Sequence, residues 1–539
     1  MAHISISPIY QVTISIHQLT PICHFIILFL VLSKTILMKR KGTLFPVLLF
    51  TMAFVLIWSC GKDDDPKPMD TMPTITDFNP ASGPVGTQVT INGTHFSATP
   101  AENEVKFGDV AANVAIATST KLIVTVPEGA TTAKISVTVD GETATSATNF
   151  TVTTTIALDK SSLELFTLDN AALTATLSQG NNSDITWSSD NENVAIVDEN
   201  GNVTATGSGT ATITASVDGD EAICTVTVHP NVYVAGYAKN AQNLTVATLW
   251  KNGAMQQLSN GASYAEAVFV TGPDVYVAGN TVNENNIYVA TLWKNGVAQE
   301  LSNGINNAFT SSLYVDSSDI YVSGYVDYSP FLAVLWKNGG TNELYEGDKA
   351  SSAYSIFIKD GDVYVAGYID NANDESIATL WKNGIKQNLS DEISLSVAYS
   401  VYVDGQDVYM GGSYTNANNV QVAALWKNGL AQNLSDGTTD ANIYSIYVSE
   451  GNVYAVGSIE NANNVSVATL WKNGVVQDLS NGIKNASAIS ISVDGEDVYV
   501  TGFAYNENNV VVATLWKNGS AESLSDGVGA ATAYSIFVK

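Results

Sequence analysis

The chain of 539 residues is poor in arginine, histidine and cysteine, and each shortage excludes a class of function. Arg40 is the only arginine, so the chain after it has no guanidinium group to clamp a phosphate or carboxylate. After Cys60 the only histidines are His95 and His229, and the only cysteine is Cys224. The chain after Cys60 therefore has almost no residues from which a His/Cys zinc site or a Cys/His nucleophilic pair could be built.

Basic residues are scarce as well, with 23 Lys+Arg against 52 Asp+Glu and a formal net charge of −29. The first 59 residues contain no acid and four of the bases, so the rest of the chain is still more acidic than this total suggests. Nucleic-acid binding needs a basic surface and is excluded. Only 14% of the residues are charged, and Thr, Ser, Asn, Gly, Val and Tyr are abundant, which indicates a secreted all-β protein.

Residues 38–59 have the layout of a secretory signal, with basic residues after Met38 and then an apolar run. The run ends in LIWSC, which resembles the lipobox of bacterial lipoproteins, although Trp58 stands where that box prefers a small residue. The resemblance implies that Cys60 becomes the lipidated first residue of the mature chain. The alternative is a membrane-spanning anchor, for which the run is short against a span of roughly 20 residues. We expect residues 1–37 to be an upstream extension of a mis-assigned start.

An acidic tether is predicted over residues 60–72. Lys62, Asp63, Asp64 and Asp65 resemble the tag that sends Bacteroidetes lipoproteins to the cell surface. A solvated, disordered tether would have the same composition. A lipid chain on such a tether predicts a protein held at the outer membrane, facing the exterior, and not passing through it.

Two immunoglobulin-like sandwiches are predicted next, because apolar and polar residues alternate between Pro/Gly turns. In residues 73–153, the run NPASGPVGTQVTING at 79–93 resembles the IPT/TIG family. In residues 154–229, Trp187 and the runs that follow it resemble the bacterial immunoglobulin-like group 2 domain, in which Trp187 is expected in the core. Cys224 is expected to be a buried, unpaired residue. Both families commonly act as spacers or adhesive modules.

Residues 231–539 are an internal repeat. The motif Leu-Trp-Lys-Asn-Gly occurs seven times, with spacings of 43 or 45 residues between its tryptophans. These are Trp250, Trp293, Trp336, Trp381, Trp426, Trp471 and Trp516. The period and the four short strands in each unit predict propeller blades in which these tryptophans pack the blades together. Asn-Gly in each motif predicts a type I′ hairpin.

The phase of the repeat predicts a closed ring. The array begins at a second strand, around Tyr233, and its last residues, 533–538, form a first strand. The last strand therefore completes the first blade and leaves no unpaired edge. The predicted fold is all-β, with two immunoglobulin-like β-sandwiches followed by a seven-bladed β-propeller.

Catalytic residues are few in the repeat region, which has no His, Cys or Arg. Catalysis by paired carboxylates, as in glycoside hydrolysis, remains possible, but most acids recur with the repeat at turns and are interpreted as turn residues. The Asn-rich loops, such as 416–419, are read as hairpin connections; calcium or sugar binding is the alternative, and calcium favours more charged oxygens than they offer. We predict no catalytic residue, no metal site and no cofactor.

One unit departs from the repeat in its loops, and we interpret it as a ligand contact. Asp327, Tyr328 and Phe331 replace the Asn loop, and Tyr345 extends the end of the fourth strand. Aromatic side chains beside acids suit stacking on a sugar or peptide, while drift in a degenerate repeat is the alternative.

The predicted function is a non-catalytic surface lipoprotein that presents the propeller to a polysaccharide or protein. A carboxylate-dependent glycosidase or lyase and a purely structural adhesin or spacer are the alternatives, and the fold alone does not choose among them.

Overall fold

The computed structural model of the chain describes residues 72–180, 184–345, 347–388 and 395–539. Strands β1 to β46 and one 3-10 turn, η2 (Pro100–Glu102), are the regular elements of these ranges. The all-β fold class is therefore confirmed. None of the helices in these ranges has the length and hydropathy that crossing a membrane requires.

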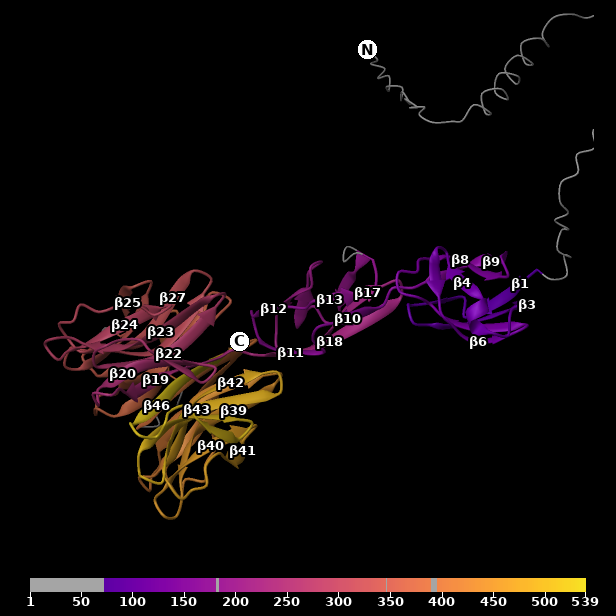
Figure 1. Cartoon of the computed structure of the whole chain (residues 1–539). Coiled ribbons are helices and arrows are strands. Elements are labelled where there is room, and N and C mark those ends of the chain that lie inside the picture. Colours follow the sequence, from indigo (N-terminus) through magenta and orange to yellow (C-terminus); the bar gives the residue numbers. More distant parts are fainter. Residues whose placement is uncertain (1–71, 181–183, 346, 389–394) are drawn as a thin grey trace, which may run out of the picture. The chain divides into compact units, whose positions relative to one another are not determined.

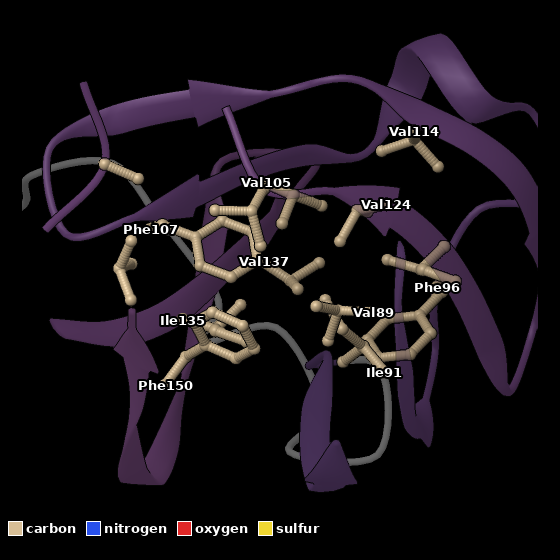
Figure 2. Close-up of a cluster of buried hydrophobic side chains, with 14 residues drawn as sticks. Val89, Ile91, Phe96, Val105, Phe107, Val114, Val124, Ile135, Val137 and Phe150 are labelled. Atoms are coloured by element: carbon tan, nitrogen blue, oxygen red, sulfur yellow. The ribbon is translucent and has the colours of Figure 1, made fainter. Parts of the chain in front are cut away.

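The first domain is a sandwich of two sheets. One sheet has the order β1 (Thr74–Asn79), β3 (Gln88–Thr94), β7 (Lys121–Thr125), β6 (Val114–Thr118). The other has the order β2 (Ser82–Gly83), β9 (Glu142–Val152), β8 (Ala133–Val139), β4 (Glu104–Phe107), β5 (Val110–Ala112). Alternate residues of each strand face the space between the sheets, as at Val89 and Ile91, which are fully buried. Figure 2 shows this core, in which the rings of Phe107 and Phe150 meet edge-on with centroids 5.2 Å apart.

The second domain has three small sheets. They are β10 (Ile156–Leu158) with β13 (Ala175–Leu177); β11 (Ser162–Phe166), β18 (Asp220–His229), β17 (Gly209–Val217) and β14 (Thr186–Ser189); and β12 (Asn170–Ala172), β16 (Asn202–Ala205) and β15 (Ala195–Val197). Cys224 is fully buried and unpaired, as expected for a small apolar residue. Trp187 is half-buried and packs against the core.

The rest of the chain forms seven four-stranded antiparallel sheets, the blades of the propeller. The first strands are β46 (Ala531–Val538), β22 (Ser263–Thr271), β26 (Ala308–Asp316), β30 (Ser351–Lys359), β34 (Ser396–Asp404), β38 (Ala441–Ser449) and β42 (Ala486–Asp494). The second strands are β19 (Val232–Lys239), β23 (Asp274–Val282), β27 (Asp319–Asp327), β31 (Asp362–Asp370), β35 (Asp407–Thr415), β39 (Asn452–Glu460) and β43 (Asp497–Tyr505).

The third strands are β20 (Thr245–Lys251), β24 (Tyr288–Lys294), β28 (Phe331–Lys337), β32 (Ser376–Lys382), β36 (Gln421–Lys427), β40 (Ser466–Lys472) and β44 (Val511–Lys517). The fourth strands are β21 (Ala254–Gln257), β25 (Val297–Glu300), β29 (Gly340–Glu343), β33 (Ile385–Asn388), β37 (Leu430–Asn433), β41 (Val475–Asp478) and β45 (Ser520–Ser523). Because neighbouring strands are antiparallel, the turns between first and second strands and between third and fourth strands lie on one face of the propeller, here called the hairpin face. The loops between second and third strands and between blades lie on the other, here called the loop face.

The ring closes through the C-terminal strand. β46 pairs antiparallel with β19, so one blade has the order β21-β20-β19-β46. Figure 1 shows yellow β46 beside magenta β19. The backbones of Asn231 and Lys539 exchange two hydrogen bonds at the end of this pair. Each first strand also packs on the first strand of the next blade, which completes the ring.

Buried tryptophans pack the blades together, as predicted. All seven tryptophans of the repeat are at most 1% exposed. Trp426, for example, lies in one cluster with Tyr364 and Leu380 of the preceding blade.

The Lys-Asn-Gly hairpins repeat one polar cluster. Asn428 has a φ of 51° and Gly429 of 83°, the values that a type I′ turn needs. The Asn428 amide donates to Asp407 at 2.7 Å, and Lys427 pairs with the same carboxylate at 2.7 Å while lying 5.0 Å over the Tyr409 ring. The hairpin residues are therefore structural.

Candidate functional site: the central channel

A cavity of about 370 Å³ lies where the first strands of the blades meet. All seven first strands contribute to its lining, together with Asn280 of β23 and Tyr325 of β27. The cavity therefore occupies the central channel of the propeller, and its volume is within the range of small-molecule sites.

A β-bulge in each first strand brings side chains to this cavity. In β34, Ala398 pairs with Gly412 and Ser400 with Gly411, which leaves Tyr399 without a partner on β35. The bulge needs the repeated glycine opposite it, because a Cβ on Gly412 would lie 1.9 Å from a backbone oxygen. The bulged residues of the seven blades are Tyr534, Glu266, Ser311, Tyr354, Tyr399, Tyr444 and Ile489.

Three bulged tyrosines form an arc along one side of the cavity. The ring centroids are 5.2 Å apart for Tyr354 and Tyr399, and 5.6 Å apart for Tyr399 and Tyr444. Burial raises the pKa of all three hydroxyls, so the phenols are neutral. The arc offers apolar ring surface to a ligand in the channel.

The serine after the bulge links neighbouring blades. Ser355 Oγ accepts the backbone N–H of Val401, and Ser400 Oγ accepts that of Ile446, both at 3.1 Å. The same bond joins Ser312 to Ile356, Ser490 to Ile536 and Ser535 to Val268. Each hydroxyl accepts in this bond, which leaves its hydrogen free to donate elsewhere.

Three blades lack the bulged tyrosine: one has Ile489, and the other two, which are adjacent, bring polar groups to the cavity. Glu266 takes the place of the bulged tyrosine, and Ala267 that of the serine. In the next blade, Thr310 stands where most blades have alanine, and its hydroxyl is buried with no hydrogen-bond partner among the described residues. Asn280, which is 3% exposed, accepts the Thr310 N–H at 3.0 Å.

Among the described residues, Glu266 is the one acidic or basic side chain that lines the cavity. Burial raises the pKa of its carboxyl group to about 7, because no positive charge compensates for the lost water. The pKa of Tyr325 and of Tyr534 is raised as well, first by burial and then by the neighbouring Glu266 charge. A carboxyl group that titrates near neutrality in a cavity is typical of functional sites.

The residues predicted as a ligand contact lie in two separate places: the exposed loop after β27 and the packing between two blades. Phe331, which is exposed, meets the Tyr325 ring edge-on at 5.4 Å and so adjoins the cavity lining. Tyr328 is also exposed, and Asp327 accepts the Ser329 backbone N–H at 3.2 Å. Tyr345 is half-buried and packs between blades on the cluster that includes Trp381.

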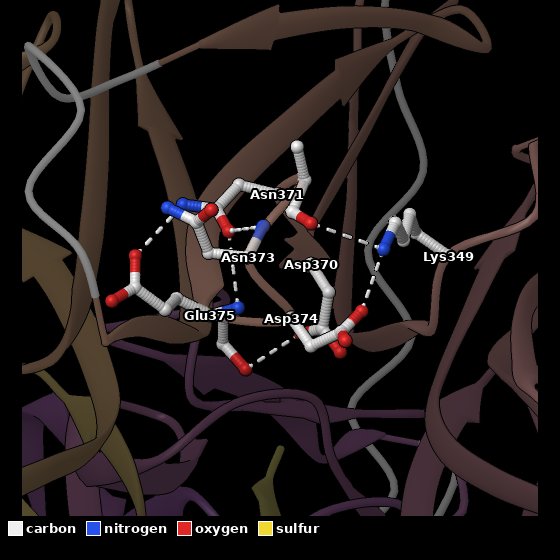
Figure 3. A network of polar contacts seen from close by, with 8 residues as sticks. Lys349, Asp370, Asn371, Asn373, Asp374 and Glu375 are labelled. Atoms are coloured by element: carbon white, nitrogen blue, oxygen red, sulfur yellow. Dashed lines mark hydrogen bonds and ion pairs between the residues drawn. The ribbon is translucent and has the colours of Figure 1, made fainter.

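The Asn-rich loops are held by their own amides. Asn461 Oδ1 accepts the N–H groups of Asn463 and Val465, and its Nδ2 donates to the Gly482 carbonyl oxygen of the next loop. Figure 3 shows the variant at 371–375, where Asn371 donates to Glu375 at 3.0 Å and Lys349 pairs with Asp374 at 2.7 Å. These bonds support the hairpin interpretation over calcium binding.

The described ranges hold no group of three or more His, Cys, Asp or Glu side chains that suits a metal ion. The predicted lipid attachment at Cys60 and the tag residues Lys62, Asp63, Asp64 and Asp65 lie outside the described residues.

Sequence reasoning missed the cavity because it searched the loops for departures from the repeat. The signal was present in the strands: aligning the first strands by their motif places Glu266 and Ser311 opposite tyrosine in four other blades.

Two family models match the chain. Residues 73–153 match the IPT/TIG domain, and residues 152–228 match the bacterial Ig-like domain (group 2), which confirms both resemblances. No sequence among the curated proteins matches the chain.

Solved structures with a similar course of the chain include auxiliary nutrient binding proteins from Bacteroides thetaiotaomicron and Bacteroides ovatus. They are 12% and 11% identical, with 75% and 74% of this chain and 98% of each of theirs covered, at TM-scores of 0.26 and 0.25. TolB from Acinetobacter baumannii is 10% identical, with 60% of this chain and 94% of that chain covered, at a TM-score of 0.34. The propeller itself is established by its strand pairing.

Proposed function

We propose that the chain is a surface lipoprotein, anchored through Cys60, whose propeller binds a polysaccharide in the central channel without cleaving it. The observation that carries this proposal is the two-sided cavity. An arc of tyrosines faces a set of carboxyl, amide and hydroxyl groups. Sugars have apolar ring faces and polar edges, and a site with aromatic surface on one side and hydrogen-bonding groups on the other fits both.

Binding is favoured over hydrolysis because one carboxyl group lines the cavity. The common glycosidase mechanisms use two carboxylates, about 5 to 9.5 Å apart, on either side of the scissile bond. Glu266 has no such companion among the lining residues. The exposed Phe331 and Tyr328 extend the proposed site toward the loop face.

A glycan screen of the chain from Gly61 to Lys539 tests the proposal. We expect a bound polysaccharide, no new reducing ends after incubation, and binding at least tenfold weaker in Tyr399→Ala. Tyr328→Ala serves as the matched exposed variant, and a smaller loss is expected there. Binding that survives Tyr399→Ala would contradict the channel as the site, and release of reducing ends would contradict a non-catalytic role. Binding only to surface proteins would contradict the polysaccharide.

A further inference from the structure

Glu266 is a carboxyl group without a partner. It replaces a tyrosine of the repeat, and among the described residues no side chain donates a hydrogen bond or supplies a cation to it. Glu266 is half-buried, and an unpaired carboxylate taken partly out of water is costly to the folded protein, so its place in a cavity points to a ligand that brings the missing positive charge.

The rings around Glu266 suit the same charge. Tyr325 and Tyr534 lie close enough for the Glu266 charge to act on their hydroxyl groups, and the tyrosine arc lines the same cavity. Aromatic faces attract ammonium groups, most strongly where water is excluded. A carboxylate among tyrosines is therefore a site for an organic ammonium ion.

The neutral polar groups beside Glu266 indicate what carries the ammonium group. Thr310 is 4% exposed, and its hydroxyl has no hydrogen-bond partner among the described residues; Asn280 is buried next to it. A lysine side chain, whose stem is apolar, would leave the hydroxyl and amide unpaired. A sugar with a free amino group places hydroxyl groups next to the amine and satisfies both.

We propose that the channel binds a sugar residue with a free amino group, held by its ammonium at Glu266 and by its hydroxyl groups at Thr310 and Asn280. This inference depends on the proposed function, since it names the ligand of the same site. The tyrosine arc stacks on the apolar face of the sugar.

Binding of a permanent cation should then depend on pH through Glu266. The other titratable groups of the lining are tyrosines of β27, β30, β34, β38 and β46, and the pKa of each lies above its usual value. They stay neutral between pH 5.5 and pH 8, while the Glu266 carboxyl, with a pKa of about 7, changes from mostly protonated to mostly ionised. Because only the ionised fraction binds, the affinity for tetramethylammonium should fall about 30-fold from pH 8 to pH 5.5.

Isothermal titration calorimetry on the chain from Gly61 to Lys539 tests the proposal. The ligands are glucosamine oligomers, N-acetylglucosamine oligomers of the same length, an acetylated lysine amide with a free side chain, and tetramethylammonium. We expect glucosamine oligomers to bind best, and Glu266→Gln to weaken them about 10- to 100-fold, the effect of losing a charge-assisted bond. Glu266→Tyr, which introduces the residue found in four other blades, controls for folding, and Glu284→Gln, an exposed acid of the same blade, should change nothing.

Three results would overturn the amino-sugar ligand: N-acetylated oligomers that bind as well as free amines, wild-type affinity in Glu266→Gln, or tighter binding of the lysine amide. Neutral glycans that bind independently of Glu266 would overturn this inference and leave the proposed function standing. A chain that binds no glycan of any kind would overturn both.

Discussion

The buried tryptophans offer a comparison within one molecule. Trp293 and Trp471 occupy the same repeat position and are at most 1% exposed. The Trp471 indole N–H donates to the Leu434 carbonyl oxygen at 3.0 Å, while the Trp293 N–H is buried with no partner among the described residues. Replacing each by phenylalanine removes a similar volume, so the two variants should differ mainly by the hydrogen bond.

The expected difference follows from the two N–H groups. Trp471→Phe loses a hydrogen bond, a net cost of about 1 kcal/mol, whereas Trp293→Phe removes an unsatisfied donor whose burial costs at least about 1 kcal/mol. Trp471→Phe should therefore be less stable than Trp293→Phe by about 2 kcal/mol. With an unfolding entropy of about 2.1 cal/mol/K per residue, a propeller of this length loses roughly 1.5 °C per kcal/mol, so the Tm values should differ by about 3 °C.

The assay is thermal unfolding followed by intrinsic fluorescence, since seven of the nine tryptophans lie in the blades. Met255→Ala is the control, because Met255 pairs with Trp250 across the strands but is 55% exposed, and its Tm should move by less than 1 °C. Equal Tm values for Trp293→Phe and Trp471→Phe, or a lower value for Trp293→Phe, would refute the reasoning.

Two further predictions concern the bulges and the hairpin face. Gly279→Ala should lower the free energy of unfolding by about 3 kcal/mol or more, because the added Cβ would lie 2.0 Å from the Tyr264 carbonyl oxygen. A Cβ on Gly261 would meet no atom within 4 Å, so Gly261→Ala should leave the denaturant midpoint of unfolding unchanged. Lys427 holds the pKa of Asp407 below its usual value, so this carboxylate stabilises the fold above its unfolded pKa and stops doing so as the pH falls through the lower folded value. In Asp407→Asn the acid-induced drop in Tm below about pH 4 should be smaller than in the wild type; an identical drop would show that the pair is not linked to stability.

The fold was predictable because the repeat makes each local pattern recur seven times. Seven Leu-Trp-Lys-Asn-Gly motifs fixed the hairpins, and the phase of the first and last units predicted that β46 would complete a blade. The hairpins and the closing strand both follow from the order of the strand motifs along the chain, and this order can be read from the sequence alone.

The cavity was not predictable in the same way, because the bulge breaks the alternation on which strand reading depends. In a regular strand Tyr399 and Ser400 would point to opposite faces, yet the bulge lets both line the channel. Of the loop residues singled out in the sequence, only Phe331 adjoins the cavity lining, because the pairing of β27 with β28 in one blade places its ring against Tyr325.

The asymmetry of the cavity is what separates a site from a packed ring. If all seven blades carried Ala-Tyr-Ser, the channel would present seven equivalent surfaces, and a ligand without sevenfold symmetry would leave most of them unused. The changes at Glu266, Asn280 and Thr310 fall in two adjacent blades and on one side of the channel, although they are up to 44 positions apart in the chain. Neutral drift in a repeat gives no reason for a carboxyl, an amide and a hydroxyl without a partner among the described residues to lie at one place, whereas the proposed ligand does.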